Sequence, residues 1–407
     1  MRTIQTRCCI TGGGPAGIML GYLLARANIP VVVLEKWPDF FRDFRGDTIH
    51  PSTMDILHEL GLLEKFLKLP HNKTNQLVGH ISGKEFLFVD FDYLKYSVHE
   101  PYIAFIPQWD FLNFISSEAK VYPDFHLMME TEGVDVIVED GKIVGVKAKS
   151  NSEEFEIRAD LTVGADGRHS TIREKLALPA EDLGAPIDVL WFRISRNNDG
   201  QTKSLAYMDG GKFLIMLDRD DYWQCASLIE KGSFEKVKEK GLEEFKASIA
   251  SMVPFIKDAI EEINNWDQIK LLSVTVDRLT TWYKEGVLCI GDSAHAMSPV
   301  GGVGINLAIQ DAVAAANVLV PAFKNNGPTI QDFKKIQKRR ELAVRATQRF
   351  QVFAHKRVLE PILKRKGPME AAFPIRLLRI FPFLRWIPAR LIGIGFRPEH
   401  IEIEFEK

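Results

Sequence analysis

A glycine-rich turn near the start of the chain constrains the fold more than any other feature of the sequence. Residues 6–11 (TRCCIT) predict a short buried strand, and the apolar pattern of residues 15–27 predicts a helix directly after it. Glycines in the turn permit a tight bend, a close approach of backbone amides to phosphate, and close packing of helix on strand. The helix N-terminus then favours an anion. We therefore expect a dinucleotide pyrophosphate to bind at Gly12, Gly14, Pro15, Ala16 and Gly17.

An acidic residue stands where such a unit needs one. A second predicted strand, residues 31–34, ends at Glu35, eighteen residues after Gly17. That spacing suits a carboxylate that accepts hydrogen bonds from the adenosine ribose hydroxyls. Glu35 and the adjacent Lys36 are therefore predicted cofactor-binding residues.

Two further glycine motifs follow predicted strands. Gly164-Ala-Asp166-Gly167 follows the strand 159–163, and Asp166 is expected either to orient a ribose or ribityl hydroxyl or to cap the next helix. Gly291 and Asp292 follow the strand 287–290, and Asp292 is placed for the ribityl chain. His295 is expected to be a structural hydrogen-bonding residue. The next segment places glycines before an apolar helix, which leaves N–H groups for the pyrimidine edge of a flavin, at Pro299, Gly302, Gly304, Ile305 and Asn306. Together the three motifs predict FAD.

From about Cys8 to Asn317 the chain resembles the single-component FAD monooxygenases with the para-hydroxybenzoate hydroxylase fold. Beyond the three motifs, the resemblance rests on the segments 44–47 (FRGD) and 107–112 (PQWDFL). It implies that Arg45 contacts the FAD phosphates and ribityl chain, and that Gln108 contacts the flavin chain. The alternatives are a solvated Arg45 and a Gln108 that only starts a helix. Val303 and Ile305 stand where the family usually has glutamine and methionine, which leaves the backbone role intact.

The resemblance also implies the architecture. We expect an α/β protein with a discontinuous Rossmann-like FAD-binding domain (residues 1–75, 101–180 and 277–350). Alternating apolar residues predict an antiparallel sheet as the substrate domain (76–100 and 181–276), with a helical run at 234–260. A basic, apolar helical segment (351–407) completes the chain.

The activity implied is hydroxylation of a hydrophobic, aromatic or polycyclic small molecule by NADH or NADPH and O2, through a flavin hydroperoxide on non-covalent FAD. No second dinucleotide motif is present, which matches transient binding of the nicotinamide cofactor. The Trp-x-Trp-x-Ile-Pro segment of the related halogenases is absent. An FAD-dependent reductase or dehydrogenase of a prenyl or quinone-like substrate is the alternative. The catalytic acid or base stays unassigned, because four polar candidates are each expected to be structural, namely His50, Tyr207, Asp209 and Tyr222.

Composition agrees with a soluble enzyme. The chain has 46% hydrophobic and 26% charged residues and a formal net charge of −2. Its four cysteines show no metal-site spacing, and buried, reduced thiols suit a cytoplasmic location. The chain contains no run of 18 apolar residues, so we expect no membrane-spanning helix. The first predicted strand begins too early to leave room for a signal peptide. We expect no nucleic-acid partner. We expect the protein to be a monomer or a homodimer.

The C-terminal segment combines basic and apolar residues. Residues 351–398 hold ten Lys or Arg and two acids, a net charge of +8, among many large apolar side chains. Prolines 374, 382 and 388 divide the segment into short pieces. Two interpretations stay open: the pieces pack on the protein with arginine stems over apolar surface, or they attach peripherally to an anionic membrane.

Overall fold

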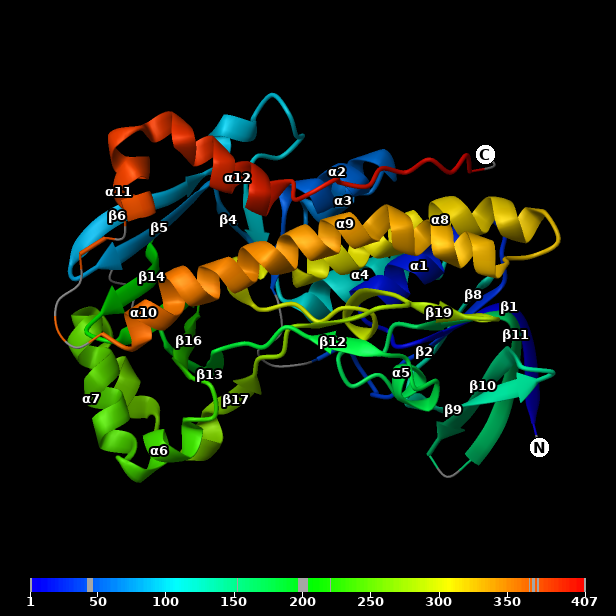
Figure 1. The fold of residues 1–407 in the computed structure, drawn as a ribbon, viewed down its shortest axis with the longest axis horizontal. Coiled ribbons are helices and arrows are strands. Elements are labelled where there is room, and N and C mark those ends of the chain that lie inside the picture. Colours follow the sequence, from blue (N-terminus) through cyan, green and yellow to red (C-terminus); the bar gives the residue numbers. More distant parts are fainter. Residues whose placement is uncertain are drawn as a thin grey trace.

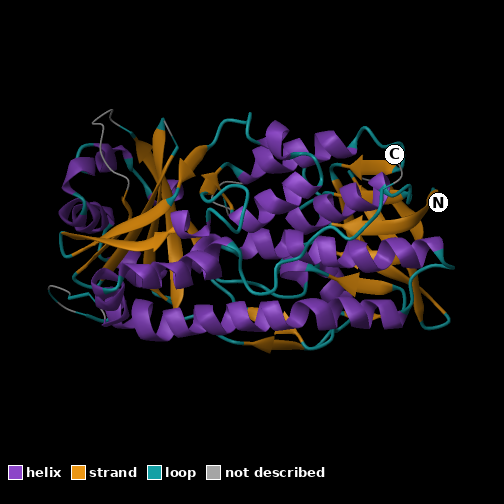
Figure 2. Ribbon diagram, turned by 90° about the horizontal axis from the view of Figure 1, so that it is seen from above, coloured by secondary structure: helices purple, strands orange, loops and turns teal. Residues whose placement is uncertain are grey.

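The computed structural model describes residues 2–405 except 42–46, 152, 197–203, 220, 366, 368–369 and 372. Strands gather at the two ends of the elongated molecule, and long helices run between them (Figures 1 and 2). The end that carries the N-terminus holds the glycine motifs. The other end holds a second, larger area of sheet.

The first sheet has a parallel core. Its central order is β19-β20-β11-β1-β2-β8, in which only β19 is antiparallel to its neighbour, and the hairpin β9–β10 extends from β11. The bounds are β1 (Thr3–Thr11), β2 (Val31–Leu34), β8 (Phe125–Met128), β9 (Thr131–Glu139), β10 (Lys142–Ser150), β11 (Glu153–Gly164), β19 (Tyr283–Lys284) and β20 (Val287–Cys289).

Alternation along β1 explains how this sheet is covered on both faces. Cys8 and Ile10 belong to the main core with the helices, whereas Cys9 belongs to a second cluster formed with the β10–β11 region. All four cysteines are buried and free, and burial raises the pKa of the Cys9 thiol to about 12. The prediction of buried thiols is confirmed. The helices that contribute to the main core include α1 (Pro15–Arg26), α2 (Pro51–Glu59), α3 (Leu63–Phe66), α4 (Gln108–Ala119) and α8 (Gly304–Lys324).

The second sheet has seven strands in the order β17-β13-β16-β15-β14-β5-β6. The sequence predicted it to be antiparallel, and one pair, β5–β14, is parallel. These two strands come from separate parts of the chain, so no hairpin fixes their direction. The bounds are β5 (Gln76–Ile81), β6 (Lys84–Asp90), β13 (Ile187–Ser195), β14 (Ser204–Asp209), β15 (Lys212–Asp218), β16 (Tyr222–Glu230) and β17 (Lys270–Ser273).

The helical run expected at 234–260 is broken into shorter pieces. Helices α6 (Phe234–Glu239) and α7 (Leu242–Met252) are separated at Gly241, whose φ of 94° favours glycine. Pro254 then starts a short 3-10 turn, η2 (Pro254–Ile256). The smaller remaining elements are β3 (Thr48–Ile49), β4 (Asn72–Thr74), β7 (Ile103–Phe105), α5 (Thr171–Lys175), β12 (Ala180–Asp182), β18 (Asp277–Leu279) and two further 3-10 turns, η3 (Ala259–Glu262) and η4 (Trp266–Gln268).

The C-terminal segment starts from a long helix that joins the two ends of the molecule (Figure 1). Helix α9 (Ile330–Ala354) continues through the π-helical turn η7 (His355–Leu359) into α10 (Glu360–Leu363). Next come α11 (Phe373–Ile380), η8 (Pro382–Arg385), α12 (Trp386–Gly393) and a tail without regular structure. The break at Pro382 agrees with the prediction of short pieces. Among the described residues, one helical stretch, Val300–Lys324, is long and apolar enough to cross a membrane, and 83% of its apolar window is buried inside the protein.

Candidate active site

The three glycine motifs meet at the carboxyl ends of adjacent parallel strands. Ala165 N donates to Thr11 O at 2.8 Å, and Ile290 N donates to Gly164 O at 3.0 Å. The strands β1, β11 and β20 therefore end side by side, and each leads into one motif. In open α/β sheets this edge is where ligands bind.

Geometry explains each glycine of the first turn. Gly12 has φ +102°, and a Cβ there would lie 2.4 Å from Ala165 O. A Cβ on Gly17 would lie 2.0 Å from Gly12 O, so the helix can pack on the turn only with glycine at this position. Gly14 differs: its φ is −74°, and the nearest atom to a Cβ is Ala165 O at 4.0 Å. The space in front of Gly14, at the start of α1, is therefore open and fits a phosphate group.

Glu35 and Lys36 point in different directions. Glu35 Oε2 accepts from Gly13 N at 3.1 Å, and its Oε1 accepts from Trp37 N at 3.2 Å. The carboxylate thus lies against the glycine turn. Lys36 is exposed, with its Nζ 3.7 Å from a Glu132 oxygen, so its side chain turns to the surface.

The segment that carries Arg45 is described only from Asp47 onward, and Arg45 lies outside the described residues. Asp47 is buried and joins two predicted site segments. Its Oδ1 accepts from the backbone N–H of Gln108 at 3.3 Å, and its Oδ2 accepts from Arg219 at 2.5 Å. Gln108 is the first residue of α4, and its backbone contact is that of a helix start. Burial raises the pKa of Asp47, while Arg219 opposes the shift.

Asp166 serves the helix that follows it. Its Oδ1 accepts from Ser170 Oγ at 2.5 Å, and its Oδ2 accepts from Ile172 N at 3.3 Å. Ser170 in turn caps α5 by accepting from Arg173 N. Burial raises the pKa of Asp166, and the bond from Ser170 opposes that shift. The helix-capping role expected of Asp166 is present in the structure.

Two hydrogen bonds hold the third motif in place. Gly291 N donates to Asp311 Oδ2 at 3.0 Å, and Ser293 Oγ donates to Gly164 O at 2.5 Å. Asp292, between these two buried residues in the turn η5 (Gly291–Ser293), is itself only half-buried. This arrangement anchors the backbone on both sides of Asp292.

The loop before α8 is fastened to the opposite strand by Asn306. Its Oδ1 accepts from His50 N and from Thr53 Oγ1, at 2.9 and 2.7 Å, and its Nδ2 donates to Thr48 O at 3.2 Å. Thr48 Oγ1 also donates to Gly302 O. Gly301 and Gly302, in the turn η6 (Val300–Gly302), have φ values of 83° and 64°. Asn306 lies in the first turn of α8, where backbone N–H groups have no partner within the helix, while its side-chain atoms are bonded to the protein.

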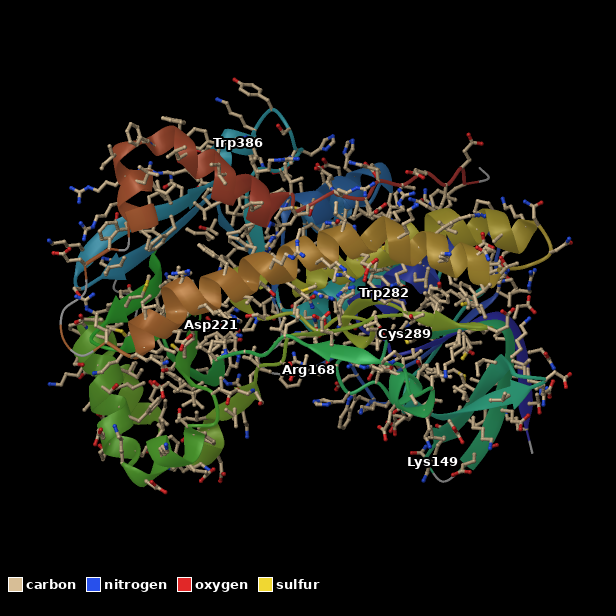
Figure 3. All side chains as sticks on the ribbon, viewed as in Figure 1. Lys149, Arg168, Asp221, Trp282, Cys289 and Trp386 are labelled. Carbon is tan, nitrogen blue, oxygen red and sulfur yellow. The ribbon has the colours of Figure 1, made fainter. Side chains whose placement is uncertain are left out.

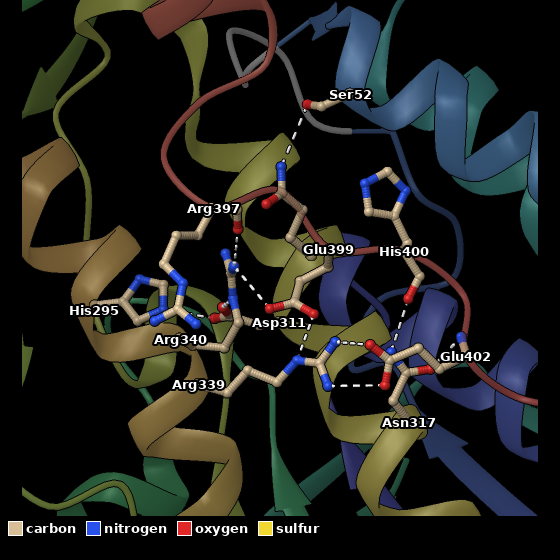
Figure 4. Close-up of polar contacts among 11 residues, drawn as sticks. Ser52, His295, Asp311, Asn317, Arg339, Arg340, Arg397, Glu399, His400 and Glu402 are labelled. Carbon is tan, nitrogen blue, oxygen red and sulfur yellow. Dashed lines mark hydrogen bonds and ion pairs between the residues drawn. The ribbon is translucent and has the colours of Figure 1, made fainter. Parts of the chain in front are cut away.

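A buried ionic cluster supports the third motif (Figure 4). Asp311 on α8 accepts from Gly291 N, from His295 Nε2 at 2.6 Å and from Arg340 Nε at 2.8 Å. Asp311 and Arg340 are both fully buried. Burial alone would raise the pKa of Asp311, but His295 and Arg340 together hold it below its usual value. His295 thus has the structural role that the sequence predicted.

The same cluster fastens the C-terminal tail. Arg340 Nη1 donates to Arg397 O at 3.3 Å and to Glu399 Oε1 at 3.4 Å. The neighbouring Arg339 binds Glu399 and Glu402, both at 2.6 Å (Figure 4). The tail therefore lies over α8 and α9, and its charges connect through Arg340 and Asp311 to the glycine motif.

The polar candidates for catalysis are spread over different surroundings. Tyr207 packs in the cluster formed with α7, and its ring stacks on His80 at 5.1 Å. Asp209 accepts from Ser82 Oγ at 2.8 Å. The ring of Tyr222 lies 5.7 Å from the Arg193 guanidinium carbon. These three are held by contacts within the second sheet and its neighbours.

His50 is fully buried beside the loop that Asn306 holds. Its Nδ1 donates to Ile392 O at 2.7 Å, and its Nε2 finds no partner among the described residues. Burial lowers the pKa of His50 to about 4, despite the bond to Ile392. His50 is therefore neutral in the folded protein at neutral pH and connects the cofactor edge to α12.

We expect His50 to weaken the protein in mild acid. The unfolded chain binds a proton on this histidine near pH 6.5, whereas the folded chain does so only near pH 4. Stability is therefore lost as pH falls from 6.5 toward 4, by about 2 kcal/mol at pH 5. The free energy of unfolding, measured with urea, should be higher at pH 7 than at pH 5. In His50→Asn this difference between the two pH values should be about 2 kcal/mol smaller.

The exposed His126 on β8 provides the matched control, because its replacement by Asn should leave the difference unchanged. An equal pH dependence in wild type and His50→Asn would contradict the assignment.

One face of the second sheet is apolar and adjoins the third motif. Trp191 on β13, Ile215 on β15 and Phe88 on β6 pack against the same cluster as Val300, which lies in the loop before α8. The loop before α8 is therefore bordered by a hydrophobic cluster, to which Leu359 and Ile362 of the C-terminal segment also belong.

Sequence patterns missed several residues of this region. Asp47 lies within the segment 44–47 but drew no prediction of its own, while Arg219, Asp311 and Arg340 lie outside all three motifs. Arg340 lies 29 positions after Asp311, and no local sequence pattern indicates that the two residues pair. Their role as a buried ion pair that supports the third motif is evident only from the folded structure.

Comparison with known proteins agrees with this geometry. The family model described as "FAD binding domain" matches residues 5–349. The chain is 28% identical over 359 residues to 6-methylpretetramide 4-monooxygenase of Streptomyces rimosus, covering 87% of this chain and 85% of that protein. It is 23% identical to para-nitrophenol 4-monooxygenase of Pseudomonas sp. strain WBC-3, covering 79% of each. The fold matches p-nitrophenol 4-monooxygenase PnpA of Pseudomonas putida DLL-E4 with a TM-score of 0.76 and 18% identity, covering 97% of this chain and 100% of that one.

Proposed function

The chain belongs to the FAD-binding domain family, and we propose that it uses NADH or NADPH and O2 to hydroxylate a hydrophobic, aromatic or polycyclic molecule. The protein is an FAD-dependent monooxygenase, and the relatives aligned over most of its length are named as monooxygenases. The observation that carries the substrate class is the apolar face of the second sheet beside Val300, in the loop before α8.

The residues present fit non-covalent FAD. In this proposal the pyrophosphate lies in the open space before Gly14, at the N-terminus of α1, and Glu35 binds the adenosine ribose. Asp292 binds the ribityl chain, and the N-terminus of α8 faces the flavin ring through the backbone of residues 302–306. When bound, FAD supplies the redox chemistry with nicotinamide and oxygen.

The chain's own groups orient the reactants and exclude water. The apolar side chains of Trp191, Ile215 and Val300 would hold a flat hydrophobic ring and keep water from the flavin. Arg219, paired with Asp47, connects the second sheet to the start of α4 and keeps the two parts of the site in register. Removing water matters because it limits the wasteful release of peroxide.

A turnover assay tests this proposal. Purified protein is mixed with NADH or NADPH and a panel of phenolic, quinone-like and polycyclic compounds, while nicotinamide oxidation and oxygen uptake are followed. We expect one class of compound to accelerate oxidation at least about tenfold, equivalent to about 1.4 kcal/mol of barrier. The product should carry one oxygen atom from labelled O2.

Two outcomes would contradict the proposal. Substrate turnover without oxygen uptake would favour the reductase or dehydrogenase of a prenyl or quinone-like substrate. Failure of both nicotinamides to reduce the bound flavin, with any compound, would refute a nicotinamide-dependent monooxygenase. A variant unable to hold FAD, such as Gly14→Glu, sets the background rate.

We also propose that the enzyme acts in the cytoplasm as a monomer or homodimer. Light scattering on the purified holoenzyme would decide between the two states, because one or two copies of a 46.1 kDa chain differ twofold in mass. The domain limits at residues 75, 100, 180, 276 and 350 remain part of this proposal. Helix α9 crosses the last of them without a break.

A further inference from the structure

The C-terminal helices carry large apolar side chains that face solvent. Ile380, Phe381, Phe383, Trp386 and Ile387 are between 44% and 67% exposed, in one run that spans the end of α11, η8 and the start of α12. We call these five residues the apolar edge. Trp386 lies at the outer rim of the molecule in Figure 3.

The opposite side of the same helices is firmly seated. On α12, Ala389 is fully buried, and a Cβ on Gly393 would lie 2.9 Å from Leu94 Cδ1. Leu94 and Phe91 belong to the turn η1 (Phe91–Leu94), which together with Ala389 and Ile394 forms a small core of its own. The packing interpretation of the C-terminal segment is thus correct for this inner face. The exposure of the apolar edge is therefore fixed by packing on the other side.

Most charges around the apolar edge are positive, although Arg376 pairs with Glu370 and Asp92 on η1 is exposed. Residues 373–398 contain five arginines and no Asp or Glu. Arg379 and Arg390 are exposed and form no ion pair with a carboxylate in the described part of the chain. Lys95 and the 90% exposed Tyr96 follow η1, which packs against α12. The surface thus combines aromatic and aliphatic side chains with unneutralised positive charge.

We propose that the apolar edge and the arginines around it are a docking surface for an anionic lipid bilayer. Phe383 and Trp386 enter the interfacial layer, and Arg379 and Arg390 bind anionic headgroups. A second copy of this chain fits the surface less well. A twofold contact would place the same patch against itself and bring Arg379 and Arg390 of the two copies together.

Docking through the apolar edge would also bring the second sheet close to the bilayer. Helices α11 and α12 cover β6, an edge strand of that sheet, so the apolar face beside Val300 would lie near the bilayer. This part rests on the proposed function: a hydrophobic substrate dissolved in the bilayer would have a short path to the site. The docking itself does not depend on it.

Flotation with vesicles tests the docking separately from activity. The FAD-loaded full chain is mixed with vesicles of phosphatidylcholine alone or with 30 mol% phosphatidylglycerol, at low and high salt. We expect binding to the anionic vesicles only, weakened by salt. Because each basic residue contributes about 1 kcal/mol, Arg379→Glu/Arg390→Glu should lower partitioning about 30-fold or more.

Matched variants distinguish binding through this surface from nonspecific adsorption to the vesicles. Phe383→Ser/Trp386→Ser should also abolish flotation, whereas Phe353→Ser and Lys142→Glu/Lys149→Glu, which change exposed residues elsewhere, should not. Three results would overturn the proposal: no flotation by wild type, equal flotation of all variants, or a dimer in solution that the Phe383 and Trp386 changes dissolve. An active enzyme that fails to float would refute the docking and leave the proposed function intact.

Discussion

Replacing Asp311 with alanine is expected to destabilise the protein by about 3–5 kcal/mol, because Arg340 would be left as a fully buried charge without its main partner. The same change removes the acceptor for Gly291 N, so the backbone beside Asp292 loses its support. FAD should therefore dissociate more readily as well. Urea unfolding and the fraction of protein that retains flavin after gel filtration measure the two effects.

Glu341→Ala is the matched control, because Glu341 pairs with Arg345 on the surface of the same helix as Arg340. An exposed pair of this kind contributes about 0–1 kcal/mol. If Asp311→Ala does not fold, Asp311→Asn keeps the shape and tests the charge alone. The double variant Asp311→Leu/Arg340→Leu should be less destabilised than Asp311→Ala, since apolar residues often replace a buried pair at little cost. A double variant that is worse than the single one would contradict this account of the cluster.

Gly14→Glu is expected to give folded protein without FAD. Gly14 has an ordinary φ of −74° and open space in its Cβ direction, so the fold should tolerate a side chain there. That side chain would fill the space assigned to the pyrophosphate and place a negative charge against it. Like charges in contact cost several kcal/mol, and about 3 kcal/mol corresponds to a loss of FAD affinity of at least about 100-fold. Flavin absorbance of the purified protein and titration of the apo-protein with FAD measure this loss.

Gly14→Gln separates size from charge, because it has the same length and should weaken FAD binding less. Lys149→Glu places the same charge on the exposed hairpin β9–β10 and should leave the flavin content unchanged. Circular dichroism should match wild type in all three variants, and their unfolding midpoints should match when each protein is compared in its FAD-free form. Full retention of FAD by Gly14→Glu would refute the assignment of this turn to the pyrophosphate.

Local sequence determined the parts of the site that depend on backbone conformation. Gly12 and Gly17 are required because any Cβ would collide with neighbouring backbone, and such demands leave a signature of glycine at fixed spacing. The strand before each motif was also readable, because short apolar runs beside glycines predict buried strands. The meeting of the three motifs follows from parallel pairing of β1, β11 and β20.

Tertiary structure decided the contacts between residues distant in the chain. Asp311 and Arg340 pair across two helices, and Asn306 holds residues more than 250 positions away, which no local pattern encodes. The parallel pairing of β5 with β14 depends on which edges meet when the second sheet assembles.

The same holds for the C-terminal segment. Its composition left two interpretations open, because an arginine-rich apolar run can cover protein or face a membrane. Packing of Ala389 and Gly393 against η1 settled which side is buried, and so left Phe383 and Trp386 outside. The sequence by itself determined where the backbone must bend for a cofactor, since that demand is local. Which side chains share a buried charge or remain exposed depended on the whole fold, since burial is a property of the assembled chain.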